Sequence, residues 1–381
     1  MNKNLPAVLR LIKKYFWRRR LSPEYVILIA TSNCNLRCKH CFLWQKNPYG
    51  WGNLDQGKND LTLEEIEKIS LSMADFFFLN LGGGEPFIRK DLPKIAEAFY
   101  RNNHIQNLLI PTNGTLNNMI LTSTKTILEK CPGLKVSIDV SIDGIGKLHN
   151  AIRGGKDTFN KAIKSLNDLL ELKKIHPNLQ VGAIISHMSY NQKHLGEIYN
   201  FLKKQINKFD SSEIKLDSIT LALTRGSPRR PKAKNIDIKY YQELSREMEN
   251  DFLKGEVSGF RKIILWPMII ATKILMHRLV IRTYLKGFQI PCLAGQLNAV
   301  IYSNGDVYPC EMLTSARLGN LREANYDFQK LWRSEKLKET VGKIKKSKCY
   351  CTHECHVPIN ILFSPKMLPK LILLSLRLQF L

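Results

Sequence analysis

Acidic residues are scarce in this chain of 381 residues, which holds 33 Asp plus Glu against 58 Lys plus Arg, a formal net charge of +25. The sequence also lacks internal repeats and low-complexity segments, and 44% of its residues are apolar, so disordered and collagen-like proteins are excluded. Its length suggests two domains, or one large domain with an appendage. A charge excess of this size is typical of proteins with an anionic partner: nucleic acid, a membrane surface or phosphate-bearing molecules.

The N-terminus also lacks the continuous apolar core and the small-residue cleavage site of a signal peptide. Its first twenty residues hold seven Lys or Arg and no acid, with apolar residues at roughly helical spacing. Residues 1–23 are therefore predicted to form a basic amphipathic segment. Two further stretches, residues 254–290 and 359–381, combine positive charge with many apolar residues. In the first of these, the uncharged run from Ile263 to Thr272 is too short to span a bilayer, which takes about 20 residues.

The three stretches carry net charges of +7, +6 and +3, so 16 of the 25 excess charges lie in about a fifth of the chain. Ordinary surface helices whose apolar faces join the core are one interpretation, and nucleic-acid binding is another. Nucleic-acid-binding surfaces, however, usually carry charge without this much exposed Leu, Ile and Phe. Each basic residue near an anionic leaflet contributes about 1 kcal/mol. We therefore expect a cytoplasmic protein in peripheral contact with the inner face of the membrane.

Between residues 25 and 223, short apolar runs alternate with helical patterns. Thr62 and Glu65 form a capping box ahead of one predicted helix, and Asp91 and Asp157 each open another. Six strands that alternate with helices at this spacing indicate parallel βαβ units, in a sheet covered on both faces or in a barrel wall. In such folds the chemistry lies at the C-terminal strand ends. The predicted strands are residues 25–30, 76–81, 107–110, 135–142, 180–185 and 218–223.

Nine cysteines are the second unusual feature. A chain of this length does not need disulfides to fold, so their clustering indicates metal ligands in a reducing compartment. Cys34, Cys38 and Cys41 follow the first predicted strand with the spacing C-x3-C-x2-C. Three thiolates leave one iron of a [4Fe–4S] cluster without a protein ligand, open to a substrate or cofactor. A zinc site completed by His40 or by a distant residue is the alternative.

Small polar residues follow each of the next three strands. Gly82 to Glu85, with the sequence Gly-Gly-Gly-Glu, come after the second strand, and three glycines let backbone approach a ligand closely. Asn113 follows the third strand, Ser141 lies at the end of the fourth, and Arg153 comes shortly after. These residues are predicted to lie on one rim, above the cysteine loop.

This combination resembles the radical S-adenosylmethionine (SAM) superfamily over about residues 24–225. The resemblance implies a partial (β/α)6 barrel in which the three cysteines ligate a [4Fe–4S] cluster and SAM chelates the fourth iron. It also implies reductive cleavage of SAM to a 5′-deoxyadenosyl radical that abstracts hydrogen from a substrate, with an electron donor such as flavodoxin or ferredoxin. By the same resemblance, the candidate SAM-binding residues are His40, Gly82, Gly83, Gly84, Glu85, Asn113, Ser141, Arg153, Ile184 and Leu223 to Arg225.

A second group of cysteines lies near the C-terminus. Cys292 and Cys310 flank two strand-like runs joined by Asn304-Gly305, which is a strong hairpin signal. The three remaining members of the group are Cys349, Cys351 and Cys355. The arrangement resembles the SPASM/twitch extension of radical SAM enzymes, which holds one or two auxiliary iron–sulfur clusters.

Five cysteines imply one auxiliary [4Fe–4S] cluster, with Cys292 and Cys310 among its ligands by this resemblance. Which two of Cys349, Cys351 and Cys355 complete it stays open. We favour Cys351 and Cys355, because cysteines separated by one residue rarely both reach one cluster. A zinc ribbon that uses His353 or His356 is the alternative, and Cys131 is expected to be a free structural thiol.

The expected fold class is α/β: a partial (β/α)6 barrel followed by a small cysteine-rich α+β domain for the auxiliary cluster. The expected parts are the basic segment 1–23, the barrel 24–235, a helical basic–apolar insertion 236–290, the auxiliary domain 291–358 and an apolar basic tail 359–381. No acid or base stands out as catalytic, and the guesses near the hairpin are Asp306, Tyr308 and Glu311.

Three functions follow from these observations. The first is a radical SAM enzyme that acts on a lipid, a lipid-linked saccharide or another membrane-associated metabolite, because basic–apolar stretches flank the catalytic module. The second is a peptide or protein maturase, against which we count the 24 residues before the first strand, fewer than a peptide-recognition domain of about 80 residues needs. The third is a zinc-stabilised nucleic-acid-binding protein, which explains the charge but not the Gly-Gly-Gly-Glu turn.

Overall fold

The structure is a computed structural model that describes residues 23–43, 57–207, 216–254 and 266–379. The basic segment predicted for residues 1–23 lies almost wholly outside the described residues, as do residues 255–265 of the second basic stretch. Within the described ranges, no helix is long and apolar enough to cross a membrane.

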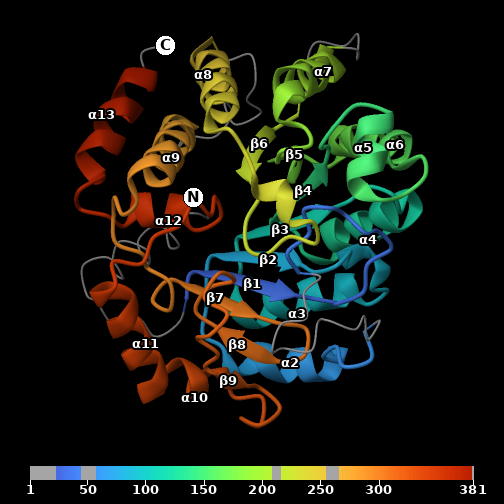
Figure 1. Ribbon diagram of the computed structural model, residues 1–381. Helices are drawn as coiled ribbons and strands as arrows, with labels where there is room; N and C mark the ends of the chain where they lie inside the picture. Colours follow the sequence, from blue (N-terminus) through green and yellow to red (C-terminus); the bar gives the residue numbers. More distant parts are fainter. Residues whose placement is uncertain (1–22, 44–56, 208–215, 255–265, 380–381) are drawn as a thin grey trace.

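A nine-stranded sheet forms the centre of the described part, in the order β6-β5-β4-β3-β2-β1-β7-β8-β9 (Figure 1). The first six strands pair in sequence order and in parallel, and the seventh joins β1 in parallel. The last two strands are antiparallel. The strands are β1 (Tyr25–Ile29), β2 (Phe78–Gly82), β3 (Asn107–Thr112), β4 (Lys135–Ser141), β5 (Leu179–His187), β6 (Ser218–Leu223), β7 (Asn298–Ile301), β8 (Asp306–Tyr308) and β9 (Gly319–Asn320).

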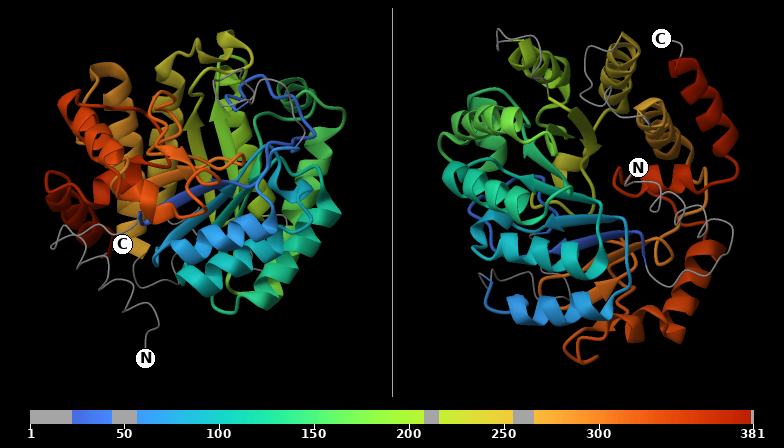
Figure 2. Two further views of the ribbon diagram at one scale, coloured as in Figure 1. Left: turned by 90° about the horizontal axis from the view of Figure 1, so that it is seen from below. Right: turned by 180° about the vertical axis from the view of Figure 1, so that it is seen from behind.

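Helices cover the convex side of this curved sheet, and the C-terminal helices lie across its open side (Figures 1 and 2). The covering helices are α2 (Leu63–Ser72), α3 (Leu92–Asn103), α4 (Asn117–Lys130), α5 (Lys147–Arg153), α6 (Thr158–Ile175) and α7 (Leu195–Asn207). The others are α8 (Ile238–Lys254), α9 (Trp266–Lys286), α10 (Phe328–Trp332), α11 (Glu335–Lys346), α12 (Val357–Leu362) and α13 (Leu368–Gln379).

The six predicted strands are confirmed, and β1 illustrates why their apolar runs are continuous. All five of its residues are buried. Val26 and Leu28 join the main core, whereas Tyr25, Ile27 and Ile29 point to the other face and pack with residues of the C-terminal part. A strand that is buried on both faces needs apolar residues at successive positions rather than at alternate ones.

The predicted turns and caps also form. Thr62 and Glu65 make the reciprocal capping box that starts α2. Asp91 and Asp157 occupy the N-cap positions of α3 and α6, where neither makes a side-chain capping hydrogen bond. Gly305 takes a φ of +89° in the turn between β7 and β8, a left-handed conformation that glycine adopts at little cost. Helix α9 packs against α8, α12 and α13, and this arrangement places the C-terminal helices beside the barrel opening.

Candidate active site

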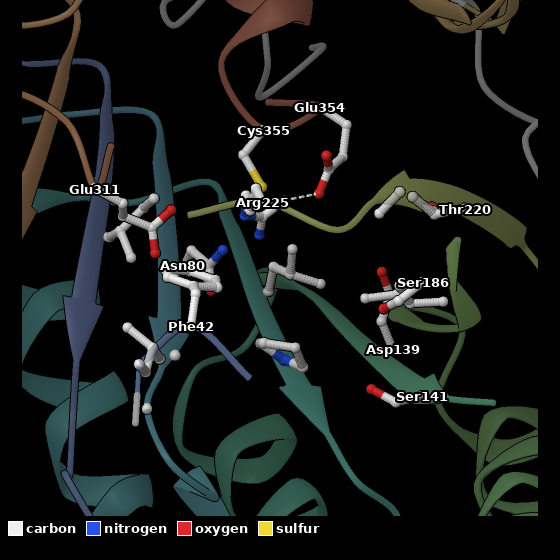
Figure 3. A pocket seen from close by; sticks show the side chains of 18 of the residues that line it. Phe42, Asn80, Asp139, Ser141, Ser186, Thr220, Arg225, Glu311, Glu354 and Cys355 are labelled. Atoms are coloured by element: carbon white, nitrogen blue, oxygen red, sulfur yellow. Dashed lines mark hydrogen bonds and ion pairs between the residues drawn. The ribbon is translucent and has the colours of Figure 1, made fainter. Parts of the chain in front are cut away.

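A cavity of about 680 Å³ lies between the inner face of the sheet and the C-terminal helices (Figure 3). Strands β1 to β6, the loops that follow them, and helices α9 and α12 all contribute to its wall. Every cysteine of the first group and every predicted SAM-binding residue lines this one cavity: Cys34, Cys38, His40, Cys41, Gly82, Gly83, Gly84, Glu85, Asn113, Ser141, Arg153, Ile184 and Leu223 to Arg225.

The loop after β1 holds Cys34, Cys38 and Cys41 at one wall of the cavity. Asp60 fixes the start of this loop, because its carboxylate accepts hydrogen bonds from Thr31 Oγ1 (2.5 Å) and from the backbone N–H of residue 32 (3.0 Å). Burial raises the pKa of Cys34 to about 12, against the lowering effect of the residue 36 backbone N–H and with smaller contributions from Glu85 and the other two thiols. Three converging thiols whose negative charge is unfavourable in protein alone fit an iron–sulfur cluster, since its iron ions offset that charge.

Gly84 lets the second strand end press against the cysteine loop. An added Cβ there would lie 2.2 Å from Asn33 O and 2.8 Å from Cys34 Cβ, closer than any side chain allows. The close approach is held by two backbone hydrogen bonds of 2.8 Å, from Gly84 N–H to Thr31 O and from Glu85 N–H to Asn33 O. The cradle therefore requires glycine at this position, as the sequence pattern suggested.

Glu85 ties the end of β2 to the end of β3 beneath the cavity. Its carboxylate accepts hydrogen bonds from Thr112 Oγ1 (2.8 Å), from the Asn113 backbone N–H (2.8 Å) and from the Phe87 backbone N–H (3.3 Å). Burial raises its pKa to about 7, against the opposing effect of these donors. Glu85 thus shapes the floor of the predicted SAM site by positioning the neighbouring turn.

Arg153 lies buried between the cysteine loop and Asp143. Its Nη2 is 2.6 Å from Asp143 Oδ2, and its Nη1 is 3.9 Å from Cys38 Sγ. His40 Nε2 lies 3.7 Å from the same Asp143 oxygen, and burial lowers the pKa of this histidine to about 4, so it is neutral at pH 7. Arg153 Nε and His40 Nδ1 are buried without a hydrogen-bond partner among the described residues, which fits a polar ligand in the cavity.

Asp143 is a residue that the sequence prediction missed, although it lies in the Ser-Ile-Asp-Gly segment at the end of β4. Replacing it with alanine leaves the Arg153 guanidinium buried and unpaired. We expect the free energy of unfolding, measured by urea denaturation, to fall by about 3–5 kcal/mol. The matched control is Glu171→Ala, which breaks an exposed pair with Lys174 (2.7 Å) and costs less than about 1 kcal/mol. Equal losses in the two variants would contradict this role of Asp143.

Helix α9 contributes a second charged pair that sequence patterns did not indicate. Lys273 of α9 and Asp139 of β4 both line the cavity. Burial lowers the pKa of Lys273 to about 8 and raises that of Asp139 to about 6, and the opposite charge of each partner limits the shift of the other. This pair connects the C-terminal helices electrostatically to the barrel wall.

Four cysteines of the second group meet between the β7–β8 hairpin and the loop after α11. Cys349 packs against the buried cluster that holds Cys292 and Cys310, and the proximity of Cys292 lowers the pKa of Cys349 to about 7. Cys310 and Cys351 are near enough to raise the pKa of Cys292. The Met312 backbone N–H donates to Cys310 Sγ (3.3 Å). Four converging thiols, one of them with an N–H···S hydrogen bond, fit an auxiliary [4Fe–4S] cluster.

Cys355 lies apart from these four. It lines the main cavity, where its sulfur points towards Arg225 (Figure 3). The expected arrangement, in which Cys355 rather than Cys349 joined Cys292, differs from the one observed. The physical reason is the chain reversal after α11, where Lys348 takes a φ of +49° and the Cys349 backbone N–H bonds to the carbonyl of residue 344 (3.0 Å). That turn places Cys349 beside Cys292.

The three candidate catalytic residues near the hairpin lie in different places. Glu311 lines the cavity, and its Oε2 lies 2.6 Å from His353 Nε2. Asp306 instead pairs with Arg317 (2.7 Å), and Tyr308 packs edge-on against Tyr302 in the core. Cys131 is buried at the end of α4, as expected of a structural thiol.

Family models match two parts of the chain. Residues 28–202 match the radical SAM superfamily, and residues 292–356 match SPASM, an iron–sulfur cluster-binding domain. These two matches confirm the family expected from the cysteine spacing and the Gly-Gly-Gly-Glu turn.

Curated relatives cover different shares of the chain. The Fe-coproporphyrin III synthase of Methanosarcina barkeri is 28% identical over 183 residues, which are 47% of this chain and 41% of that protein. The GTP 3′,8-cyclase of Sulfurimonas denitrificans is 28% identical over 201 residues, 50% of this chain and 59% of that protein. A probable GTP 3′,8-cyclase of Methanococcus vannielii is 27% identical over 286 residues, 72% of this chain and 86% of that protein. The chain thus spans about half the length of the first two relatives.

Solved structures share the fold over most of the chain. Streptococcus suis SuiB bound to S-adenosylmethionine has a TM-score of 0.59 at 18% identity, covering 90% of this chain and 74% of that one. The structure of anSMEcpe with bound AdoMet has a TM-score of 0.58 at 20% identity, covering 94% of this chain and 99% of that one.

Proposed function

Because this chain belongs to the radical SAM superfamily and carries a SPASM domain, we propose that it directs a 5′-deoxyadenosyl radical to a substrate drawn from a membrane, a lipid or a lipid-linked saccharide. The bound cluster and SAM supply the radical chemistry. Cys34, Cys38 and Cys41 hold the cluster, and the turn at Gly84 and Glu85 shapes the SAM site. The observation that carries the membrane source is an apolar–basic patch beside the cavity.

The apolar–basic patch is defined as exposed residues of helix α13, of Lys366 just before it, and of the C-terminal end of α9. Its apolar members, each between 44% and 56% exposed, are Tyr284, Leu285, Ile372, Leu373 and Leu376. Its exposed basic members are Arg282, Lys286, Lys366, Lys370 and Arg377. The two helix ends are adjacent, because Lys366 Nζ donates to Gln289 O (3.4 Å). Exposed apolar side chains with lysine and arginine around them suit the surface of an anionic bilayer.

Helix α12 connects the patch to the cavity. Ile359, Leu362 and Phe363, at this helix and its C-cap, line the cavity, and both α12 and α13 pack on α9. An apolar substrate that leaves the bilayer at the patch therefore meets apolar side chains on its way to the radical site. This continuity favours a lipid or lipid-linked substrate over a water-soluble one.

We assign the auxiliary cluster to Cys292, Cys310, Cys349 and Cys351, the four thiols that converge. The nucleic-acid-binding alternative accounts for the positive charge, but it leaves both family matches unexplained. A peptide substrate remains the alternative outcome of the binding test below.

The membrane proposal predicts flotation with anionic liposomes that depends on the patch. Wild-type protein should float with vesicles of phosphatidylglycerol and phosphatidylcholine, and Ile372→Ser/Leu373→Ser/Leu376→Ser should lower the bound fraction at least about tenfold, since each lost apolar side chain removes favourable burial. The matched control changes two other exposed apolar residues, Leu71→Ser/Ile175→Ser, on α2 and α6.

Flotation that the control preserves and the α13 variant loses would support the proposal. Wild-type protein that stays unbound at low salt would overturn the membrane source and favour a peptide or a soluble substrate. It would leave the radical SAM chemistry untouched.

A further inference from the structure

Cys355 occupies a place in the cavity that neither cysteine group explains. It is partly accessible, it lines the cavity near the start of α12, and its sulfur points inwards in Figure 3. Its neighbours are the buried cluster that contains Tyr25, against which it packs, and the ion pair between Arg225 and Glu354. Because the four auxiliary thiols converge elsewhere, this thiol is free to meet a substrate.

The two thiol sites lie at opposite ends of β1. Tyr25, the neighbour of Cys355, is the first residue of the strand, whereas Cys34 follows its last residue, Ile29. Four residue steps along a strand span roughly 13 Å. A substrate in the cavity between these ends therefore presents one face to the SAM site and another face to Cys355.

An independent observation indicates that a ligand binds near Cys355. Asn80 is 7% exposed and lines the cavity, and its Nδ2 donates to Tyr25 OH (3.1 Å). Its Oδ1 is buried without a hydrogen-bond partner among the described residues. Glu354 also lines the cavity, and its Oε2 is likewise buried without a hydrogen-bond partner among the described residues. Two buried acceptors without donors call for a ligand with hydroxyl or amino groups at this end of the cavity.

We propose that Cys355 is a catalytic residue that donates a hydrogen atom to the substrate radical, on the face away from SAM. The S–H bond of Cys355 breaks and a C–H bond forms on the substrate, which leaves a thiyl radical on Cys355. A reduced one-electron carrier protein, or dithionite in vitro, then supplies one electron, and solvent supplies one proton, to restore the thiol. Each turnover thus consumes one SAM, two electrons and one proton, and the substrate carbon is returned with inverted configuration.

The environment keeps Cys355 in the protonated form that this role needs. Burial raises its pKa to about 12, with a further contribution from Glu354 that Arg225 opposes. Only the thiol, and not the thiolate, carries a hydrogen atom to give.

The test uses reconstituted holoenzyme and the variants Cys355→Ser and Cys131→Ser. Serine keeps the shape of the side chain, but its O–H bond is too strong to give up hydrogen to a carbon radical. The first readout needs no turnover: Cys355→Ser should retain the full iron content. Loss of iron in this variant would make Cys355 a cluster ligand and overturn the proposal.

The second readout is deuterium uptake in D2O, where thiols exchange their hydrogen with solvent. The probe is a total cell extract, lipid and water-soluble fractions together, incubated with SAM and dithionite and fractionated afterwards. Wild type and Cys131→Ser should place deuterium on carbon in one component, and Cys355→Ser should place at least about tenfold less there while it still forms 5′-deoxyadenosine. Equal labelling by Cys355→Ser would overturn the donor role.

The inference rests on the radical chemistry of the proposed function but not on its membrane source. A labelled lipid component supports both. A labelled water-soluble component supports the donor role and overturns the membrane source, so the two failures are distinguishable.

Discussion

Replacing Gly84 with alanine is expected to lower the iron held by the first cysteine loop to the level of a variant that lacks Cys34, Cys38 and Cys41. The new Cβ would lie 2.2 Å from Asn33 O, which is backbone and cannot swing aside as a flexible side chain does. The loop must therefore shift, and Cys34 shifts with it. We expect formation of 5′-deoxyadenosine to fall at least about a hundredfold, because misplacing reacting groups by about 1 Å costs that much.

The matched control is Gly196→Ala in α7, where an added Cβ meets no atom within 4 Å among the described residues. Alanine also has the higher helix propensity there. This variant should retain wild-type iron and activity. Full iron and activity in Gly84→Ala would show that the close approach to the cysteine loop is not needed for the site.

Removing one thiol of the auxiliary group should cost the chain about four irons of about eight, one cluster of two. Cys292→Ser and Cys349→Ser should be equivalent in this respect, because both thiols belong to the group of four that we assign to this cluster. The radical site holds its own three cysteines, so SAM should still be cleaved in the presence of dithionite. Iron and acid-labile sulfide analysis of anaerobically purified protein measures the loss.

Cys355→Ser is the control for the auxiliary assignment, since it removes a cysteine of the same segment that faces the cavity instead. It should keep all of the iron. The opposite pattern, in which Cys355→Ser loses iron and Cys349→Ser keeps it, would restore the ligand set expected from the sequence.

Local patterns predicted the parts of the fold that depend on neighbouring residues. The β1 segment is buried on both faces, so its continuous apolar run identified a parallel strand. Thr62 and Glu65 satisfy one another's backbone across one helical turn, so their spacing alone identified the start of α2. Gly305 marks a turn that needs a positive φ.

Local sequence patterns could not predict contacts between segments that are far apart in the sequence. The electrostatic interaction between Lys273 of α9 and Asp139 of β4 depends on how these two elements pack, and neither local sequence predicts it. The turn at Lys348 determines which of the last three cysteines lie beside Cys292, and the spacing of the cysteines in the sequence does not predict that turn. Asp143 lies in the Ser-Ile-Asp-Gly segment at the end of β4, but only the structure shows that it pairs with Arg153.

The structure also shows where part of the positive charge lies. Exposed apolar and basic residues occur on α9 and α13, two helices that are far apart in the sequence and pack on one another. The sequence indicated which stretches were basic and apolar, whereas their position beside the cavity comes from the packing of α12 and α13 on α9.

The central claim is tested most directly by 5′-deoxyadenosine formation in anaerobic, cluster-reconstituted protein given SAM and dithionite. Wild type and Cys131→Ser should both form it, and the variant Cys34→Ala/Cys38→Ala/Cys41→Ala should form none above the level without enzyme. Production of 5′-deoxyadenosine that survives loss of all three cysteines, or its absence from iron-loaded wild-type protein, would contradict the account.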